Sequence, residues 1–69
     1  ADGDVLFDDG VTAQGMRVTL DTTPPVTQLH VVRVDAAVAT HFVAATAAGD
    51  DDGMAALLAV VRSWRPPPG

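Results

Sequence analysis

The front of the chain carries a pattern that predicts a β-hairpin. An apolar run at 5–7 and a second run from Val11 onward are separated by residues that include Asp9 and Gly10. Asp-Gly is a preferred pair for a two-residue hairpin turn, because its residues tolerate positive φ. We therefore expect the first two strands to meet at Asp9 and Gly10.

The second run alternates between apolar and polar residues. Met16, Val18 and Leu20 are separated by single polar residues, which predicts a strand with one buried and one solvated face. Gly15 lies just before this alternation and indicates a β-bulge that shifts the register. Two prolines at 24–25 then end the strand, because proline donates no hydrogen bond to a ladder.

The stretch VTQLHVVRVD, at 26–35, has the strongest strand pattern in the chain. Leu29 and Val31 point to one face, while Val32 and Val34 point to the other. Apolar residues on both faces are typical of a strand that is covered on both sides. We expect a third strand here, with neither face open to water.

Residues 36–48 fit a helix, and they also fit a strand. Asp35 offers a helix N-cap and Gly49 a C-terminal stop, which favours a helix between them. Val38 and Phe42, however, belong to an alternation with period two, and β-branched residues recur throughout the segment. A helix is our prediction, with a fourth strand as the alternative.

The closing stretch predicts a second helix. Three aspartates at 50–52 provide caps and negative charge at its positive end, while Arg62 and Arg65 lie near its negative end. Prolines at 66–68 cannot continue the helix. At about 100° per residue, one broad apolar stripe forms on the side expected to face the core: Met54, Leu57, Leu58, Val60, Val61 and Trp64.

These elements predict an α+β fold of βββαα order. A small antiparallel sheet of about three strands precedes two helical segments, and the first of those segments is the one that remains open to a fourth strand. We assign residues 1–65 to a single small domain or subunit fragment, and 66–69 to a proline-rich tail. The sequence suggests no resemblance to a known family.

Length and composition limit the core that this chain can build. A chain of 69 residues buries only about 60% of the surface that its unfolded form exposes. The absence of cysteine excludes disulfides and thiolate zinc sites as stabilising devices. An ion site, unusually good packing or a partner surface must therefore add to the stability.

The charge balance and the apolar runs exclude two kinds of partner. Nine acidic and four basic residues give a net charge of −5, which disfavours contact with a phosphate backbone. No apolar run approaches the roughly 18 residues of a membrane span. We expect no nucleic-acid binding and no membrane span, while the compartment stays unknown. Because the chain begins at Ala1 rather than Met, we also expect either a processed chain or a segment cut from a longer one.

Uncharged surface is the main indication of a partner. No residue from 36 to 49 is charged, and the solvent side of the closing helix carries mostly alanine. A surface helix normally bears charged residues, so their absence indicates a covered face. Compositional bias toward alanine, a strong helix former, is the competing explanation. We expect a protein partner or a homo-oligomer, with this interface: Phe42, Met54, Leu57, Val61 and Trp64.

Few side chains are suited to catalysis. His30 and His41 are the two imidazoles, and His30 is the candidate general base or metal ligand, assisted by Asp35 or Asp21. A half-buried structural histidine is the more common role for such a residue. The spacing of eleven residues between the histidines matches no compact zinc motif.

The acidic clusters are the second candidate chemistry. Asp50 and Asp52 are the candidate ligands of a Ca²⁺ or Mg²⁺ ion. The chain has no Glu to close a calcium loop as a bidentate ligand, so helix capping and turn formation explain these residues better. No glycine-rich phosphate loop is present, and we expect no cofactor.

Two hypotheses from different functional classes follow. The first is a non-catalytic interaction module or small subunit that completes its core against a partner chain or a second copy. The alternative is a small component of an enzyme, with a site around His30 that another chain completes. The limited core and the uncharged segment 36–49 favour the first.

Overall fold

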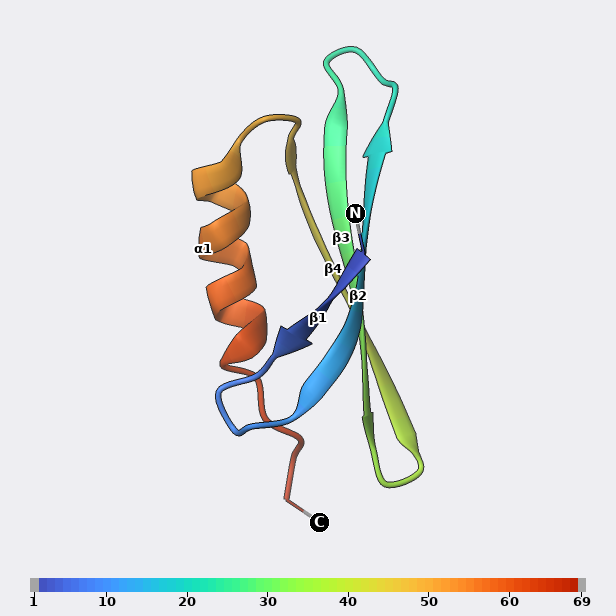
Figure 1. Ribbon diagram of the computed structural model, residues 1–69, viewed down its shortest axis with the longest axis vertical. Coiled ribbons are helices and arrows are strands. Elements are labelled where there is room, and N and C mark those ends of the chain that lie inside the picture. The colour runs from blue at the N-terminus through green and yellow to red at the C-terminus, as the bar shows by residue number, and fades with distance from the viewer. Residues whose placement is uncertain (1, 69) are drawn as a thin grey trace.

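The computed structural model describes residues 2–68 and contains a four-stranded antiparallel sheet with one helix against one of its faces (Figure 1). The α+β class is confirmed, whereas the detail of three strands and two helices is wrong. Each strand pairs with its neighbour in the chain, so the sheet is a meander. The elements in order are β1 (Asp2–Leu6), β2 (Thr12–Leu20), β3 (Val26–Asp35), β4 (Val38–Ala47) and α1 (Asp51–Arg62).

The segment predicted as a first helix is β4, so the alternative of a fourth strand holds. β4 pairs with β3 over its whole length, from Val26 opposite Ala47 to Asp35 opposite Val38. Asp35 ends β3 instead of capping a helix, and the chain reverses through a turn in which Ala36 takes a φ of 53°. A full-length partner strand satisfies the backbone of this segment and outweighs the helix propensity of its alanines.

The predicted first hairpin is present, but its loop has three residues rather than two. The Phe7 amide donates to the Val11 carbonyl at 2.8 Å, and the Gly10 amide donates to the Phe7 carbonyl at 3.0 Å. Gly10 has a φ of 88°, the left-handed conformation that closes a three-residue hairpin loop.

Gly15 does not form the predicted bulge. The register of β1 and β2 runs unbroken through it, and Gly15 lies opposite Gly3. A Cβ at Gly15 would lie only 2.7 Å from the Gly3 carbonyl oxygen. The glycine therefore permits a close approach between the two strands.

The closing helix begins as predicted, although its buried stripe is narrower. Asp50 is the N-cap and accepts a hydrogen bond from the Gly53 amide at 3.0 Å. Met54 is buried, but Leu57 is 38% exposed and Val60 is 68% exposed. Only the residues that face the sheet are packed against the core: Met54, Leu58, Val61 and Trp64.

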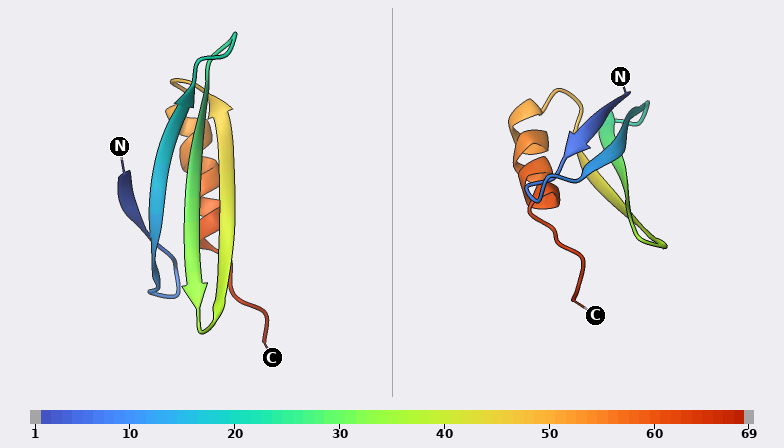
Figure 2. Two further views of the ribbon diagram at one scale, coloured as in Figure 1. Left: turned by 90° about the vertical axis from the view of Figure 1, so that its right-hand side faces the viewer. Right: turned by 60° about the horizontal axis from the view of Figure 1, so that its bottom comes forward.

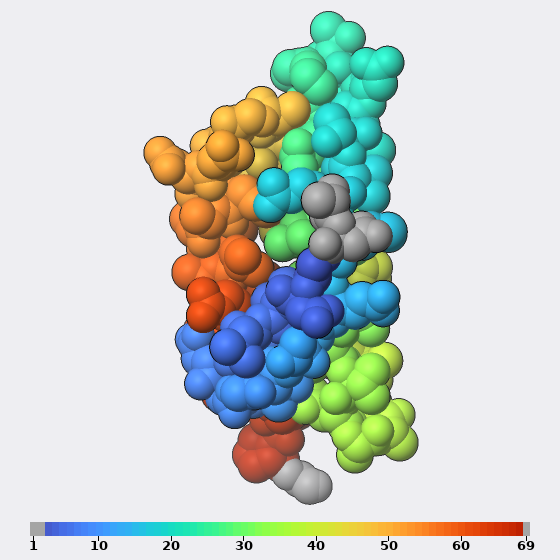
Figure 3. Space-filling model, viewed as in Figure 1, coloured from blue at the N-terminus to red at the C-terminus, as the bar shows by residue number. Residues whose placement is uncertain are grey.

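The core lies between α1 and one face of the sheet, here called the inner face. The end of α1 is tied to β1, because Arg62 Nε donates to the Leu6 carbonyl at 2.8 Å and the Asp8 amide donates to the Arg62 carbonyl at 3.0 Å. In Figure 3 the β1 segment and its turn lie against the lower part of the helix. The buried apolar side chains are Val5, Phe7, Ala13, Leu29, Val31, Ala44 and Met54.

Candidate functional site

The other face of the sheet, here called the outer face, is left open. Figure 2 (left) looks directly at this face, with the four strands in front and α1 behind them. The expectation that the 26–35 strand is covered on both sides is therefore met on one side only, within the chain described. Large apolar side chains stand exposed on the outer face: Leu6, Met16, Leu20, Val32, Val34 and Val43.

The outer face is also uncharged across its three long strands. Side chains alternate between the faces, so the register assigns every second residue of β2, β3 and β4 to the outer face. None of these is an Asp or an Arg. The outward residues are Thr12, Gln14, Met16, Val18 and Leu20 of β2, Val26, Gln28, His30, Val32 and Val34 of β3, and Ala39, His41, Val43, Ala45 and Ala47 of β4.

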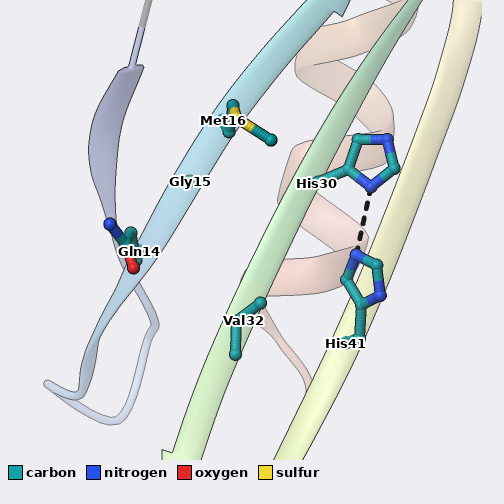
Figure 4. Close-up of a pocket in the computed structure, with 6 residues that line it drawn as sticks. All are labelled: Gln14, Gly15, Met16, His30, Val32 and His41. Carbon is teal, nitrogen blue, oxygen red and sulfur yellow. Dashed lines mark hydrogen bonds between the residues drawn. The ribbon is translucent and has the colours of Figure 1, made fainter.

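Both histidines lie at the centre of this face. His30 of β3 and His41 of β4 are diagonal neighbours, because His30 pairs with Val43 and His41 pairs with Val32. His30 Nδ1 lies 3.1 Å from His41 Nε2, with the ring centroids 5.2 Å apart. A hollow of about 360 Å³ adjoins this pair, and Gln14, Met16 and Val32 help to line it. Figure 4 shows the bond between the two rings together with these residues.

Gln28 determines which ring nitrogen of His30 carries the proton. The Gln28 side chain presents its carbonyl oxygen, Oε1, at 2.9 Å from His30 Nε2. A carbonyl oxygen can only accept, so Nε2 of His30 is the donor in this contact, and in the tautomer with one proton on Nε2 the lone pair is on Nδ1. His41 Nε2 then donates to His30 Nδ1, and the histidines form one chain of hydrogen bonds with Gln28.

The acidic partners expected for His30 lie elsewhere. Asp35 accepts from Arg33 Nε at 2.9 Å on the inner face, and Asp21 lies beyond the end of β2. His30 and His41, which the sequence spaces eleven residues apart, are brought together because β3 and β4 form a hairpin. Strand pairing, which the predicted helix at 36–48 had excluded, creates this contact.

The candidate metal ligands Asp50 and Asp52 lie at the start of α1. Asp50 caps the helix through its hydrogen bond with Gly53, and Asp52 is exposed in the first turn. Over residues 2–68, no three or more His, Asp, Glu or Cys side chains are grouped so that they could hold a metal ion.

The residues predicted as an interface are mostly used inside the chain itself. Met54 is buried, while Phe42, Val61 and Trp64 are partly buried against the same core. Leu57 is the one member that stands exposed. The broad apolar surface that remains open lies on the opposite side of the sheet, where the sequence analysis had expected a covered strand.

Sequence reasoning missed the most densely bonded side chain, Arg33. Its side chain is 1% exposed, and it forms ion pairs with Asp9 at 2.6 Å and Asp35 at 2.9 Å. The guanidinium carbon lies 4.6 Å from the ring centroid of Phe7 and 5.3 Å from that of Trp64. Arg33 thus joins the β1–β2 turn, the end of β3 and the residues after α1.

The paired charges shift the ionisation of this cluster. The hydrogen bonds from Arg33 hold the pKa of Asp9 below its ordinary value of 3.8, although partial desolvation of the carboxylate opposes the shift. Hydrogen bonds to Asp35 and then to Asp9 raise the pKa of Arg33. The guanidinium therefore remains charged at every pH at which the protein is folded.

We predict that Asp9→Asn removes part of the acid sensitivity of the fold. A carboxylate whose pKa is lowered by folding stabilises the folded state above its unfolded pKa of 3.8, and this contribution is lost as pH falls through the lower folded value. Thermal melts between pH 2 and pH 7 should therefore show a smaller loss of melting temperature below pH 4 in the variant than in the original protein.

Asp8→Asn is the matched control for this prediction. Asp8 is half exposed and lies 3.7 Å from Arg62, a separation at which a surface ion pair contributes little. Its acid profile should follow that of the original protein. An unchanged profile in Asp9→Asn as well would show that the Asp9 pair does not contribute to acid unfolding.

The single helix in the described part of the chain is 12 residues long, and it is not long and apolar enough to cross a membrane. No protein-family model matches the sequence, and neither the curated proteins nor the solved structures include a significant match.

Proposed function

We propose that this protein is a non-catalytic interaction module or small subunit that completes its core by packing its outer face against a second copy or a partner chain. The observation that carries the proposal is the outer face, which is apolar and carries no Asp or Arg on β2, β3 and β4. Exposed apolar residues are normally scattered, whereas a contiguous patch is typical of a binding surface. Here they lie on adjacent strands of one face of the sheet.

The dimensions of the outer face suit a protein partner. The three long strands contain nine or ten residues each. At about 3.3 Å per residue and about 4.8 Å between strands, they cover roughly 30 by 14 Å. This area corresponds to a small interface and exceeds what a small ligand would cover.

The charge distribution favours a second copy as the partner. The protein carries a net charge of −5, so two molecules repel unless their acidic residues are kept apart. Asp50, Asp51 and Asp52 lie at the start of α1, on the inner side of the sheet. Packing two outer faces together, with the sheets about 10 Å apart, would place both helices and the aspartates at 50–52 of both copies on the outside. Asp4 of β1 is on the packed side, next to the strand β2.

The test is the mass of the protein in solution, measured by light scattering after size exclusion over a dilution series. We expect a dimer that dissociates or unfolds on dilution. Val43→Lys should weaken the dimer at least tenfold, because it places a charge beside His30 on the outer face, where Val43 is 53% exposed. Val60→Lys is the matched control on the solvent side of α1 and should leave the mass unchanged.

Two results would distinguish the remaining possibilities. A protein that is monomeric at every concentration and shows no cooperative melting transition would favour a different partner chain over a second copy. A compact monomer that melts cooperatively at every concentration would contradict the interaction proposal, because such a chain needs no further surface to complete its core.

The alternative proposal is a component of an enzyme with its site around His30. It is favoured by the hydrogen-bonded histidine pair beside an accessible hollow, since His30 Nδ1 offers a lone pair. His30→Gln should then abolish the activity of the complete enzyme without changing the melting temperature. Full activity in that variant would exclude a catalytic role for His30.

A further inference from the structure

We propose that His30 and His41 form a binding site for a late first-row divalent metal ion, with Cu²⁺ preferred over Zn²⁺. The two imidazoles would supply two ligands, and water would fill the other positions. Imidazole nitrogen is a good ligand for both ions, and Cu²⁺ binds a given nitrogen site more tightly than Zn²⁺ does. Both ligands come from one chain, so the site does not need the proposed interaction. Because it lies on the outer face, it is open in a chain whose outer face is not covered.

The distance between the two nitrogens fits one shared ion. Metal–imidazole bonds of about 2.0–2.1 Å place two neighbouring ligand nitrogens about 2.9 Å apart at a right angle and about 3.3 Å apart at a tetrahedral angle. His30 Nδ1 and His41 Nε2 are separated by 3.1 Å. Because His41 is exposed, its ring can turn so that both lone pairs point at an ion in the adjoining hollow.

The proton between the rings can be accommodated without creating a charge. His30 Nδ1 carries no proton in the tautomer that has its proton on Nε2, and its lone pair accepts from His41 Nε2. His41 must present a lone pair at Nε2, so its single proton moves to Nδ1 and the ring stays neutral. Metal binding thus replaces the histidine–histidine hydrogen bond with two metal–nitrogen bonds.

Gln28 supplies the outer support that metal-binding histidines usually have. A ligating histidine commonly donates its other N–H to a carbonyl or carboxylate, which orients the ring and increases its basicity as a ligand. His30 Nε2 donates to Gln28 Oε1 at 2.9 Å in this manner. The ligand is therefore already held in the required tautomer before an ion arrives.

The surroundings of the pair also suit a cation. Outward positions on β2, β3 and β4 carry no arginine that would repel it. Met16 is the cross-strand partner of His30, and both Met16 and Gln14 line the same hollow. Their side chains approach from β2, on the far side of His30 from His41, as Figure 4 shows.

The experiment is a titration of the full chain with Cu²⁺ as the one added metal. Binding is measured by calorimetry and by electron paramagnetic resonance. We expect one ion per chain and the hyperfine pattern of two imidazole nitrogens. His30→Gln and His41→Gln should each weaken binding at least tenfold and leave at most one nitrogen in the spectrum. Gln28→Ala should weaken binding roughly tenfold, because it removes only the supporting hydrogen bond.

Asp52→Asn is the control, since the acidic cluster at the start of α1 is the competing place for a cation. It should bind Cu²⁺ as the original protein does. In NMR spectra the bound Cu²⁺ should broaden the methyl signals of Met16 and Val43 on the outer face, while Met54 in the core should stay sharp. Equal Cu²⁺ affinity in the original protein and both histidine variants, or broadening centred on α1, would overturn the proposal.

Discussion

Arg33→Ala is expected to abolish the cooperative thermal transition at neutral pH. The substitution leaves the carboxylates of Asp9 and Asp35 partly buried without the cation to which both are bonded. It also opens a gap beside Phe7 and Trp64, because the guanidinium contacts both rings. Removing one partner of a buried ionic network is far more damaging than replacing the whole network. Circular dichroism during heating measures the effect.

Two further variants distinguish the effect of leaving buried charges unpaired from the effect of losing any arginine side chain. Arg17→Ala changes an exposed arginine on β2 and should leave the melting temperature nearly unchanged. The triple variant Asp9→Asn, Arg33→Met, Asp35→Asn removes all three charges and should recover a cooperative transition. If Arg33→Ala melts within a few degrees of the original protein, the Arg33 cluster does not hold the fold together.

Phe7→Ala should have the second largest effect, a loss of about 3–5 kcal/mol in the free energy of unfolding. Phe7 is 1% exposed and packs against Phe42, with ring centroids 5.7 Å apart. A domain of this length has a total stability of roughly 3–10 kcal/mol, so the variant should be largely unfolded at 37 °C. Urea denaturation followed by tryptophan fluorescence gives the value.

Leu6→Ala is the control beside it. Leu6 precedes Phe7 in the chain but points to the outer face and is 55% exposed. Its replacement should cost less than about 1 kcal/mol in a monomer. A loss in Leu6→Ala as large as that in Phe7→Ala would mean that the outer face is buried in solution, which would support the interaction proposal instead.

The parts of the fold that the sequence predicted correctly depend on a few residues that form a turn or cap a helix. Asp-Gly located the first hairpin, and the aspartates at 50–52 together with Arg62 located α1. The segment at 36–48 was assigned wrongly because alanine-rich composition fits a helix, while its alternating pattern was given less weight. Pairing with β3 decided the conformation, and pairing is not visible in a window of local sequence.

The candidate site was predictable only in part, for the same reason. His30 was singled out, but its partner His41 was assigned to a helix, so the contact between them could not be foreseen. Arg33 was missed even though it shares the inward phase of Leu29 and Val31 along β3. The signal that could have identified the cluster was an arginine at an inward position of a strand, because a buried arginine needs acidic partners and aspartates occur at the neighbouring turns.

The free edge of β4 has a consequence for how the protein must be handled. β4 is the last strand of the sheet, and its ten residues include no proline and no charged side chain. Proline and charged residues are the features that usually prevent an edge strand from pairing with another molecule. The outward amide and carbonyl groups of β4 can extend the hydrogen-bonded ladder into another molecule. At high concentration, or when α1 is loosened, linear growth of one sheet through successive chains is the expected route to precipitation, and a lysine in β4 would be its simplest remedy.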